Sequence, residues 1–229
     1  MANWSIYKAK EELSDVSNDY GVAVAFFDGR GGPPARGGGN THQFYASMGD
    51  RIKADDIQLT VQGQTISSNF GTIDSSQFNL EQLLSSGISN QVFKNDDNHL
   101  ADKDRITMQQ LADKSYKSYS DFKSHPKFVP YLENMSTLQY YSKTNIGSRP
   151  SKRGNSKELN FSDLRAIPFV GSWSQSKQNV PGFFGVGSAI LAFDERGEFD
   201  KVDSLYQNSA FFRTLIANSM MSLTKSFFK

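Results

Sequence analysis

The chain has 229 residues, with 25 Lys and Arg against 24 Asp and Glu, so its formal net charge is +1. A balance this even excludes a global electrostatic attraction to nucleic acid or to an anionic membrane, and any anion site must be local. The absence of cysteine excludes disulfides and thiolate metal ligands and fits a reducing compartment. No secretory signal is visible at the N-terminus, and the most apolar stretch, residues 181–193, is too short and Gly-rich to span a bilayer. We therefore expect a soluble, cytoplasmic chain with neither a nucleic-acid nor a membrane partner.

The N-terminal segment predicts a short helix followed by a strand. Apolar residues recur at helical spacing over residues 4–13, with most of the charged residues on other faces. Residues 21–27 form a continuous apolar run of strand length, which favours a strand buried on both faces of a parallel sheet. This run leads directly into a glycine-rich segment, an order typical of a piece of a βα repeat.

Further along the chain, the patterns predict more helix than strand. Residues 58–62 and 164–173 resemble strands, although Pro168 is unfavourable inside a central strand. Helices are predicted over residues 101–122, ending at His125-Pro126, and over residues 185–193 and 209–225. The fold class is therefore α/β and helix-rich, with too few strands for a closed eight-stranded barrel. The chain is expected to be an incomplete part of something larger.

The glycine-rich segment at residues 29–39 is the most informative one for chemistry. Glycines allow backbone amides to approach a ligand closely, and Arg30 and Arg36 supply forked donors that match phosphate or carboxylate. Three interpretations remain open: an ordered anion-binding loop, a flexible linker, or an arginine-glycine segment that binds RNA. RNA-binding segments of this kind lie in disordered polar surroundings, whereas this one follows an apolar run.

A second group of cations surrounds residues 147–168. Arg149, Lys152 and Arg153 lie in a polar loop that could bind an anionic substrate or simply be solvated. Arg165 interrupts an apolar run, where an unpaired charge would be costly, so it should meet a carboxylate or a ligand. The three histidines share no metal-ligand spacing, and Glu11-Glu12 resembles solvated helix charge.

Taken together, these segments resemble the phosphoenolpyruvate carboxylase family in motifs and in their order. That family has a Phe-His-Gly-Arg-Gly-Gly loop continuing to Arg-Gly-Gly-Gly, a Thr-Glu-Gln-Gly-Glu segment, a Gly-Ser-Arg-Pro loop, a Leu-Arg-Ala-Ile-Pro-Trp segment and Pro-Ala-Trp-Leu-Gly-Val-Gly. The corresponding residues here are Phe27-Asp28-Gly29-Arg30-Gly31-Gly32 with Arg36-Gly37-Gly38-Gly39, Thr60-Val61-Gln62-Gly63-Gln64, Gly147-Ser148-Arg149-Pro150, Leu164-Arg165-Ala166-Ile167-Pro168-Phe169 and Pro181-Gly182-Phe183-Phe184-Gly185-Val186-Gly187. The resemblance extends over essentially the whole chain.

The resemblance implies a (β/α)8 barrel with added helices that works as a homotetramer. The family's reaction is an anaplerotic carbon dioxide fixation that supplies the tricarboxylic acid cycle: with Mg²⁺ or Mn²⁺ it joins bicarbonate to phosphoenolpyruvate, giving oxaloacetate and phosphate. By motif position, Arg30 and Arg165 bind the phosphate together with Gly29, Gly31 and Gly32, and Arg149 lies on the bicarbonate side. These three arginines are the expected catalytic residues. Arg36 and Lys225 match the allosteric site for aspartate or malate.

The departures from the family pattern also lead to expectations. Asp28 replaces a histidine and could neutralise part of the charge on Arg30, Val61 and Gln64 replace two glutamates, and Pro33-Pro34 stiffens the loop. The family's metal-binding carboxylates, its Ser-Gly-Lys segment and its catalytic histidine have no counterpart here. We therefore expect residues 1–229 to be one partial domain, truncated at both ends, with no metal ligands and no activity alone. The alternative is a non-catalytic module that binds phosphate or a dicarboxylate.

Overall fold

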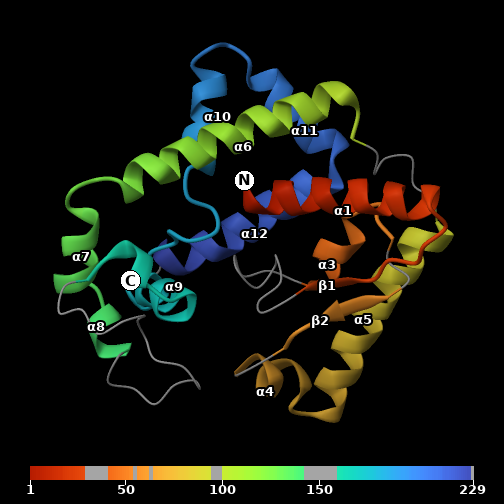
Figure 1. The fold of residues 1–229 in the computed structure, drawn as a ribbon, viewed down its shortest axis with the longest axis horizontal. Coiled ribbons are helices and arrows are strands. Elements are labelled where there is room, and N and C mark those ends of the chain that lie inside the picture. Colours follow the sequence, from red (N-terminus) through yellow and green to blue (C-terminus); the bar gives the residue numbers. More distant parts are fainter. Residues whose placement is uncertain (29–40, 54–55, 62–63, 94–99, 142–158, 228–229) are drawn as a thin grey trace.

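The computed structural model describes residues 1–28, 41–53, 56–61, 64–93, 100–141 and 159–227, and most of these residues are helical (Figure 1). In chain order the elements are α1 (Ala2–Asp19), β1 (Phe26–Asp28), α3 (Thr41–Ala46), β2 (Ile57–Leu59), α4 (Gln64–Phe70), α5 (Ile73–Val92), α6 (Asp102–Lys123), α7 (Phe128–Asn134), α8 (Leu138–Tyr141), the 3₁₀ turn η2 (Phe161–Asp163), α9 (Ala166–Gln175), α10 (Val186–Asp194), α11 (Phe199–Asn208) and α12 (Ala210–Phe227).

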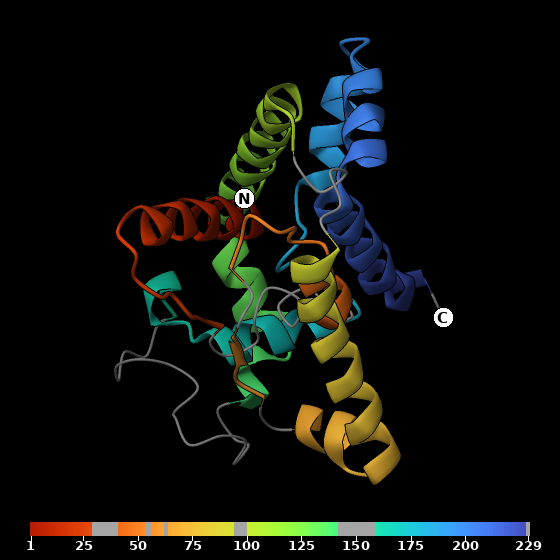
Figure 2. The same ribbon diagram turned by 90° about the vertical axis from the view of Figure 1, so that its right-hand side faces the viewer.

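Helix α6 is the element around which the others are arranged. It contacts α1, α10 and α11, and α7, α8 and α9 gather near its C-terminal end (Figure 1). Helices α4 and α5 contact each other, and α4 lies far from α6 in both views (Figures 1 and 2). Acidic residues Asp102 and Asp104 in the first turn of α6 and Lys123 in its last turn complement the helix dipole.

Two hydrophobic clusters hold the helices together, and α6 reaches both. The first cluster joins α1, α3, α6, α10, α11 and α12, and Met108 and Leu111 of α6 are buried in it. The second cluster is largely aromatic and joins α7, α8 and α9, with Tyr119 and Phe122 of α6 packed against it. The members of both clusters are spaced three or four residues apart on α6, so one helix presents apolar side chains to two cores.

The strand predicted at residues 21–27 is shorter and more exposed than expected. Only Phe26–Asp28 is strand, and the prediction that it is buried on both faces is wrong, because the Phe27 side chain is 65% exposed. Phe26 packs against the first cluster and Asp28 is buried, whereas Phe27 lies between them on the other face of the strand. An apolar run shows that a segment can be buried, but neighbouring elements decide how many of its faces are covered.

The strand predicted at residues 164–173 is wrong, because Ala166–Gln175 forms helix α9. Pro168 is the third residue of this helix, where the backbone N–H that proline lacks would have no acceptor inside the helix. Phe169 and Trp173 then lie four residues apart on one helical face, and both pack in the second cluster.

The other helix predictions are confirmed, with changed boundaries. Helices α6, α10 and α12 cover the ranges predicted at 101–122, 185–193 and 209–225, and the chain turns at His125-Pro126. Helix α1 is longer than the predicted 4–13 and continues to Asp19. The predicted strand at 58–62 is β2, which pairs in parallel with β1.

The helix-rich α/β class is therefore confirmed, while the (β/α)8 barrel and the extent of the domain stay predictions. Within the described ranges the sheet consists of β1 and β2 only. None of the described helices has the length and apolarity that crossing a bilayer requires.

Gly185 fixes the contact between α10 and α6. It precedes α10 with φ of +88°, and a Cβ at this position would lie 2.5 Å from the backbone oxygen of Ser115 on α6. Gly185→Ala should therefore lower the free energy of unfolding by at least about 2 kcal/mol, since it adds left-handed strain to a backbone clash. Urea denaturation monitored by circular dichroism measures this change.

Gly187→Ala is the matched control. Gly187 is the second residue of α10, and a Cβ added there would meet no atom within 4 Å, so alanine should be neutral or stabilising by up to about 1 kcal/mol. Equal losses of stability in the two variants would contradict the assigned role of Gly185.

Candidate functional site

The parallel pairing of β1 and β2 brings two of the predicted segments to one edge of the sheet. Phe26 pairs with Ile57 and Asp28 with Leu59, and the Thr60 N–H donates to the Asp28 carbonyl oxygen at 3.1 Å. Parallel strands end at the same edge, so the glycine-rich segment that begins after Asp28 and the segment that begins at Thr60 leave from neighbouring positions. Ligands of open α/β sheets bind at this carboxyl edge.

Asp28, the last residue of β1, is held by a buried ion pair. Its Oδ2 lies 2.8 Å from Nζ of Lys10 on α1, and both side chains are only 9% exposed. The Tyr45 hydroxyl on α3 donates to the same oxygen, and the Lys10 ammonium also lies over the rings of Phe26 and Tyr45, 5.4 and 5.7 Å from their centroids. Burial raises the pKa of Tyr45, and the hydrogen bond to Asp28 and the charge of Asp28 raise this pKa further.

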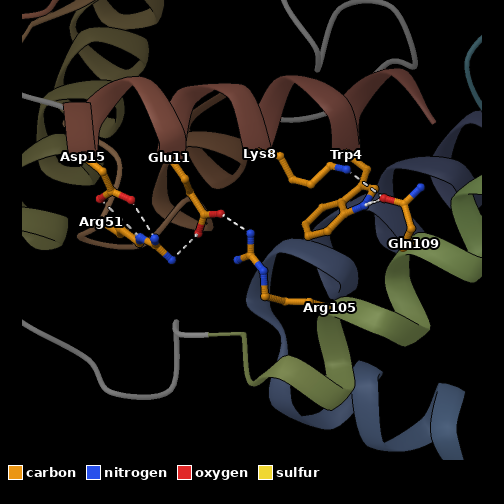
Figure 3. Close-up of polar contacts among 7 residues, drawn as sticks. All are labelled: Trp4, Lys8, Glu11, Asp15, Arg51, Arg105 and Gln109. Atoms are coloured by element: carbon orange, nitrogen blue, oxygen red, sulfur yellow. Dashed lines mark hydrogen bonds and ion pairs between the residues drawn. The ribbon is translucent and has the colours of Figure 1, made fainter. Parts of the chain in front are cut away.

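A second set of charges ties α1 to the rest of the molecule (Figure 3). Nη2 of Arg105 on α6 donates to Oε2 of the buried Glu11 carboxylate at 2.7 Å. Arg51 lies between two carboxylates, with its Nη1 4.0 Å from Glu11 Oε1 and its Nη2 2.6 Å from Asp15 Oδ2. Burial, with the charge of Glu11 beside it, raises the pKa of Tyr7, and Arg51 lowers the pKa of the Asp15 carboxyl through a hydrogen bond.

The same figure shows that α1 and α6 also meet through an amide. Trp4 Nε1 and Lys8 Nζ both donate to Oε1 of Gln109, each at 2.8 Å (Figure 3). The interpretation of Glu11 as solvated charge is wrong, because its buried carboxylate is paired with Arg105 and Arg51. Helical spacing gives no information about these two arginines, because they come from other segments.

Arg165 immediately precedes α9 in an extended conformation, and its backbone oxygen accepts from the Phe169 N–H at 3.1 Å. Its side chain is half-buried, and its Nε is fully covered without a hydrogen-bond acceptor among the residues that the structure describes. A covered guanidinium N–H without an acceptor is costly. Neither a carboxylate nor a ligand contact is shown for Arg165, so the prediction that it meets one stays open.

Most of the predicted site residues lie outside the described residues. This is true of Gly29, Arg30, Gly31, Gly32, Arg36 and Arg149, and Lys225 lies on α12 without a described side chain. The convergence of Arg30, Arg149 and Arg165 on one anion therefore stays a prediction. No three His, Asp or Glu side chains of the described ranges gather as metal ligands would.

Sequence reasoning missed Lys10 and Tyr45. Lys10 is one of several charged residues on an amphipathic helix, and Tyr45 lies in a short helix that the sequence did not predict. The one available signal was Asp28 itself, a charge at the end of an apolar run, which requires a partner if it is buried.

A separate groove of about 530 Å³ lies between α6 and the turn that joins α10 to α11. Three of the cations that line it already have carboxylate partners, since Lys117 contacts Asp121 at 2.8 Å while Arg196 and Lys201 share Glu198. We therefore assign the candidate site to the sheet edge and not to this groove.

Comparison with models of known protein families matches residues 1–228 to phosphoenolpyruvate carboxylase. The match covers all but the last residue and includes the sheet edge, Arg165 and the segment that contains Gly185. This chain belongs to the phosphoenolpyruvate carboxylase family.

Proposed function

We propose that this chain is the part of a phosphoenolpyruvate carboxylase that binds the substrate phosphate and lies beside the bicarbonate. The reaction joins bicarbonate to phosphoenolpyruvate and yields oxaloacetate and inorganic phosphate, as in other carboxy-lyases of the family. The family match over residues 1–228 supports this proposal. The preserved order of the glycine-rich, Gly-Ser-Arg-Pro and Leu-Arg-Ala-Ile-Pro segments supports it further.

The observation that carries the proposal is the shared edge of β1 and β2. The register Asp28 to Leu59 means that the segment with Arg30 and the segment with Thr60 leave the sheet side by side. An anion bound at this edge would meet the backbone amides and guanidinium groups of a glycine-rich segment, which suit phosphate oxygens. The buried pairing of Asp28 with Lys10 further supports an anion site, because the carboxylate at the end of β1 is already neutralised.

The proposed chemistry is electrostatic. When the phosphoryl group passes from phosphoenolpyruvate to bicarbonate, negative charge is spread over the phosphate oxygens. Arg30 and Arg165 would bind these phosphate oxygens, and Arg149 would bind the bicarbonate-derived oxygens. Guanidinium groups that are held in place before the reaction stabilise the developing negative charge and so lower the activation barrier. We propose that the family's Mg²⁺ or Mn²⁺ is held by carboxylates that have no counterpart in this sequence.

The remaining family properties are proposals as well. Arg36 and Lys225 would bind aspartate or malate as inhibitor, and the full-length protein would form a cytoplasmic homotetramer.

Replacing Arg165 tests the phosphate site. Arg165→Ala should weaken phosphoenolpyruvate binding, measured by calorimetry, by about tenfold or more, because charge-assisted hydrogen bonds to an anion contribute roughly 1.5–3 kcal/mol. Arg165→Lys keeps the charge but loses the planar fork and should bind with intermediate affinity. Arg165→Ala should not lower the free energy of unfolding, since its covered Nε has no described acceptor to lose.

Arg196→Ala serves as the control for that experiment. Arg196 is an exposed arginine whose Nε donates to Glu198 at 2.7 Å in the separate groove, so its removal should leave phosphoenolpyruvate affinity unchanged. Unchanged affinity in Arg165→Ala, or an equal loss in both variants, would refute the assignment of Arg165.

The purified 229-residue protein should bind phosphoenolpyruvate without converting it to oxaloacetate. The reason is that the family's metal carboxylates and catalytic histidine have no counterpart in this sequence. Oxaloacetate is measured by its reduction with NADH and malate dehydrogenase, in the presence of bicarbonate and Mg²⁺. Bicarbonate-dependent oxidation of NADH above the background without phosphoenolpyruvate would contradict this prediction.

A further inference from the structure

Three elements meet at the end of β1 through one carboxylate oxygen. Oδ2 of Asp28 accepts from Lys10 Nζ on α1 at 2.8 Å and from the Tyr45 hydroxyl on α3. All three residues are buried, and Phe26, two residues before Asp28, lies under the Lys10 ammonium. Burying a carboxylate and an ammonium is unfavourable unless each is paired, so this contact is a condition for the way α1, α3 and β1 pack.

The position of this ion pair gives it a consequence beyond packing. Two peptide units separate Asp28 from Arg30, so their Cα atoms lie no more than about 7 Å apart whatever the conformation between them. This distance is shorter than the roughly 8 Å Debye length at physiological ionic strength. An uncompensated carboxylate at position 28 would therefore repel an anion at the sheet edge and attract Arg30 away from it.

We propose that Lys10 is a positioning residue for the anion site: it neutralises the Asp28 carboxylate, which is buried beside the Tyr45 hydroxyl, so that the sheet edge stays favourable for a phosphate. This inference rests on the proposed function, since it presupposes an anion at this edge. It also explains how an aspartate can stand where the family has a histidine. Lys10 is the cation that contacts Asp28 among the described residues, and Arg30 lies outside them, so the expectation that Asp28 neutralises part of the charge on Arg30 stays a prediction.

The alternative is that the ion pair only stabilises the fold. The two roles predict different effects of the same variants on anion affinity. Lys10→Gln and Asp28→Asn each remove the ion pair and should each lower stability. They change the local charge in opposite directions, however, by −1 and by +1. A structural role alone predicts that both variants lose anion affinity in parallel with stability. A positioning role predicts that Lys10→Gln loses anion affinity and that Asp28→Asn keeps it.

The experiment measures binding of phosphoenolpyruvate and of inorganic phosphate by calorimetry at pH 8.5. The variants are Lys10→Gln, Asp28→Asn, the double variant that carries both changes, and Tyr45→Phe. Lys10→Gln should weaken binding about tenfold, the order expected for one added charge at this distance. Asp28→Asn should bind at least as tightly as the wild type, and the double variant should return to within about threefold of it, because the local net charge is then restored.

Tyr45→Phe is the matched control, because it removes a donor to the same Oδ2 without changing charge, and its affinity should stay within about threefold of the wild type. Equal affinity losses in Lys10→Gln and Asp28→Asn, or no loss in Lys10→Gln, would overturn the proposal. If circular dichroism shows that Lys10→Gln is unfolded, Asp28→Asn decides alone: weakened binding overturns the positioning role and retained binding supports it. Absence of binding by the folded wild type would instead refute the proposed function.

Discussion

The requirement that buried charge be paired governs the N-terminal half of this structure. Helix α1 carries two buried charged residues, and each finds its partners on another segment: Lys10 on Asp28 of β1, and Glu11 on Arg105 of α6 and Arg51 of the loop after α3. Because an unpaired charge in either position would be strongly unfavourable, these contacts constrain where α1 lies relative to the sheet and to α6. The anion site proposed at the sheet edge depends on that placement.

The second constraint is the close approach of helices around α6. Gly185 allows the start of α10 to approach the Ser115 backbone. Just before this glycine, Phe184 stacks on Phe122 of α6 at a centroid distance of 4.5 Å, and both rings pack against the second cluster. The motif that contains Gly185 is one of those that resemble the family. Its glycine has a structural explanation in this contact and needs no direct part in chemistry.

The candidate site could be located from sequence only in part. Glycine and arginine next to a predicted strand indicated an anion site at the end of β1, whereas the segment after Leu59 was noted only for its resemblance to a family motif. The pairing of β1 with β2 shows how residues some thirty positions apart reach one edge. Lys10 and Tyr45 could not be found in this way, because neither lies in a motif and both depend on the packing of α1 and α3 against β1.

What the sequence determined by itself is local. Apolar periodicity, proline and glycine were sufficient to predict the long helices at α6 and α12, and motif order was sufficient to predict the family. Tertiary structure alone decided that Ala166–Gln175 is a helix, that Phe27 is exposed, and that Lys10 and Glu11 are buried. The physical reason is that burial and charge pairing depend on which distant segments come together, and a pattern within a single segment contains no information about its neighbours.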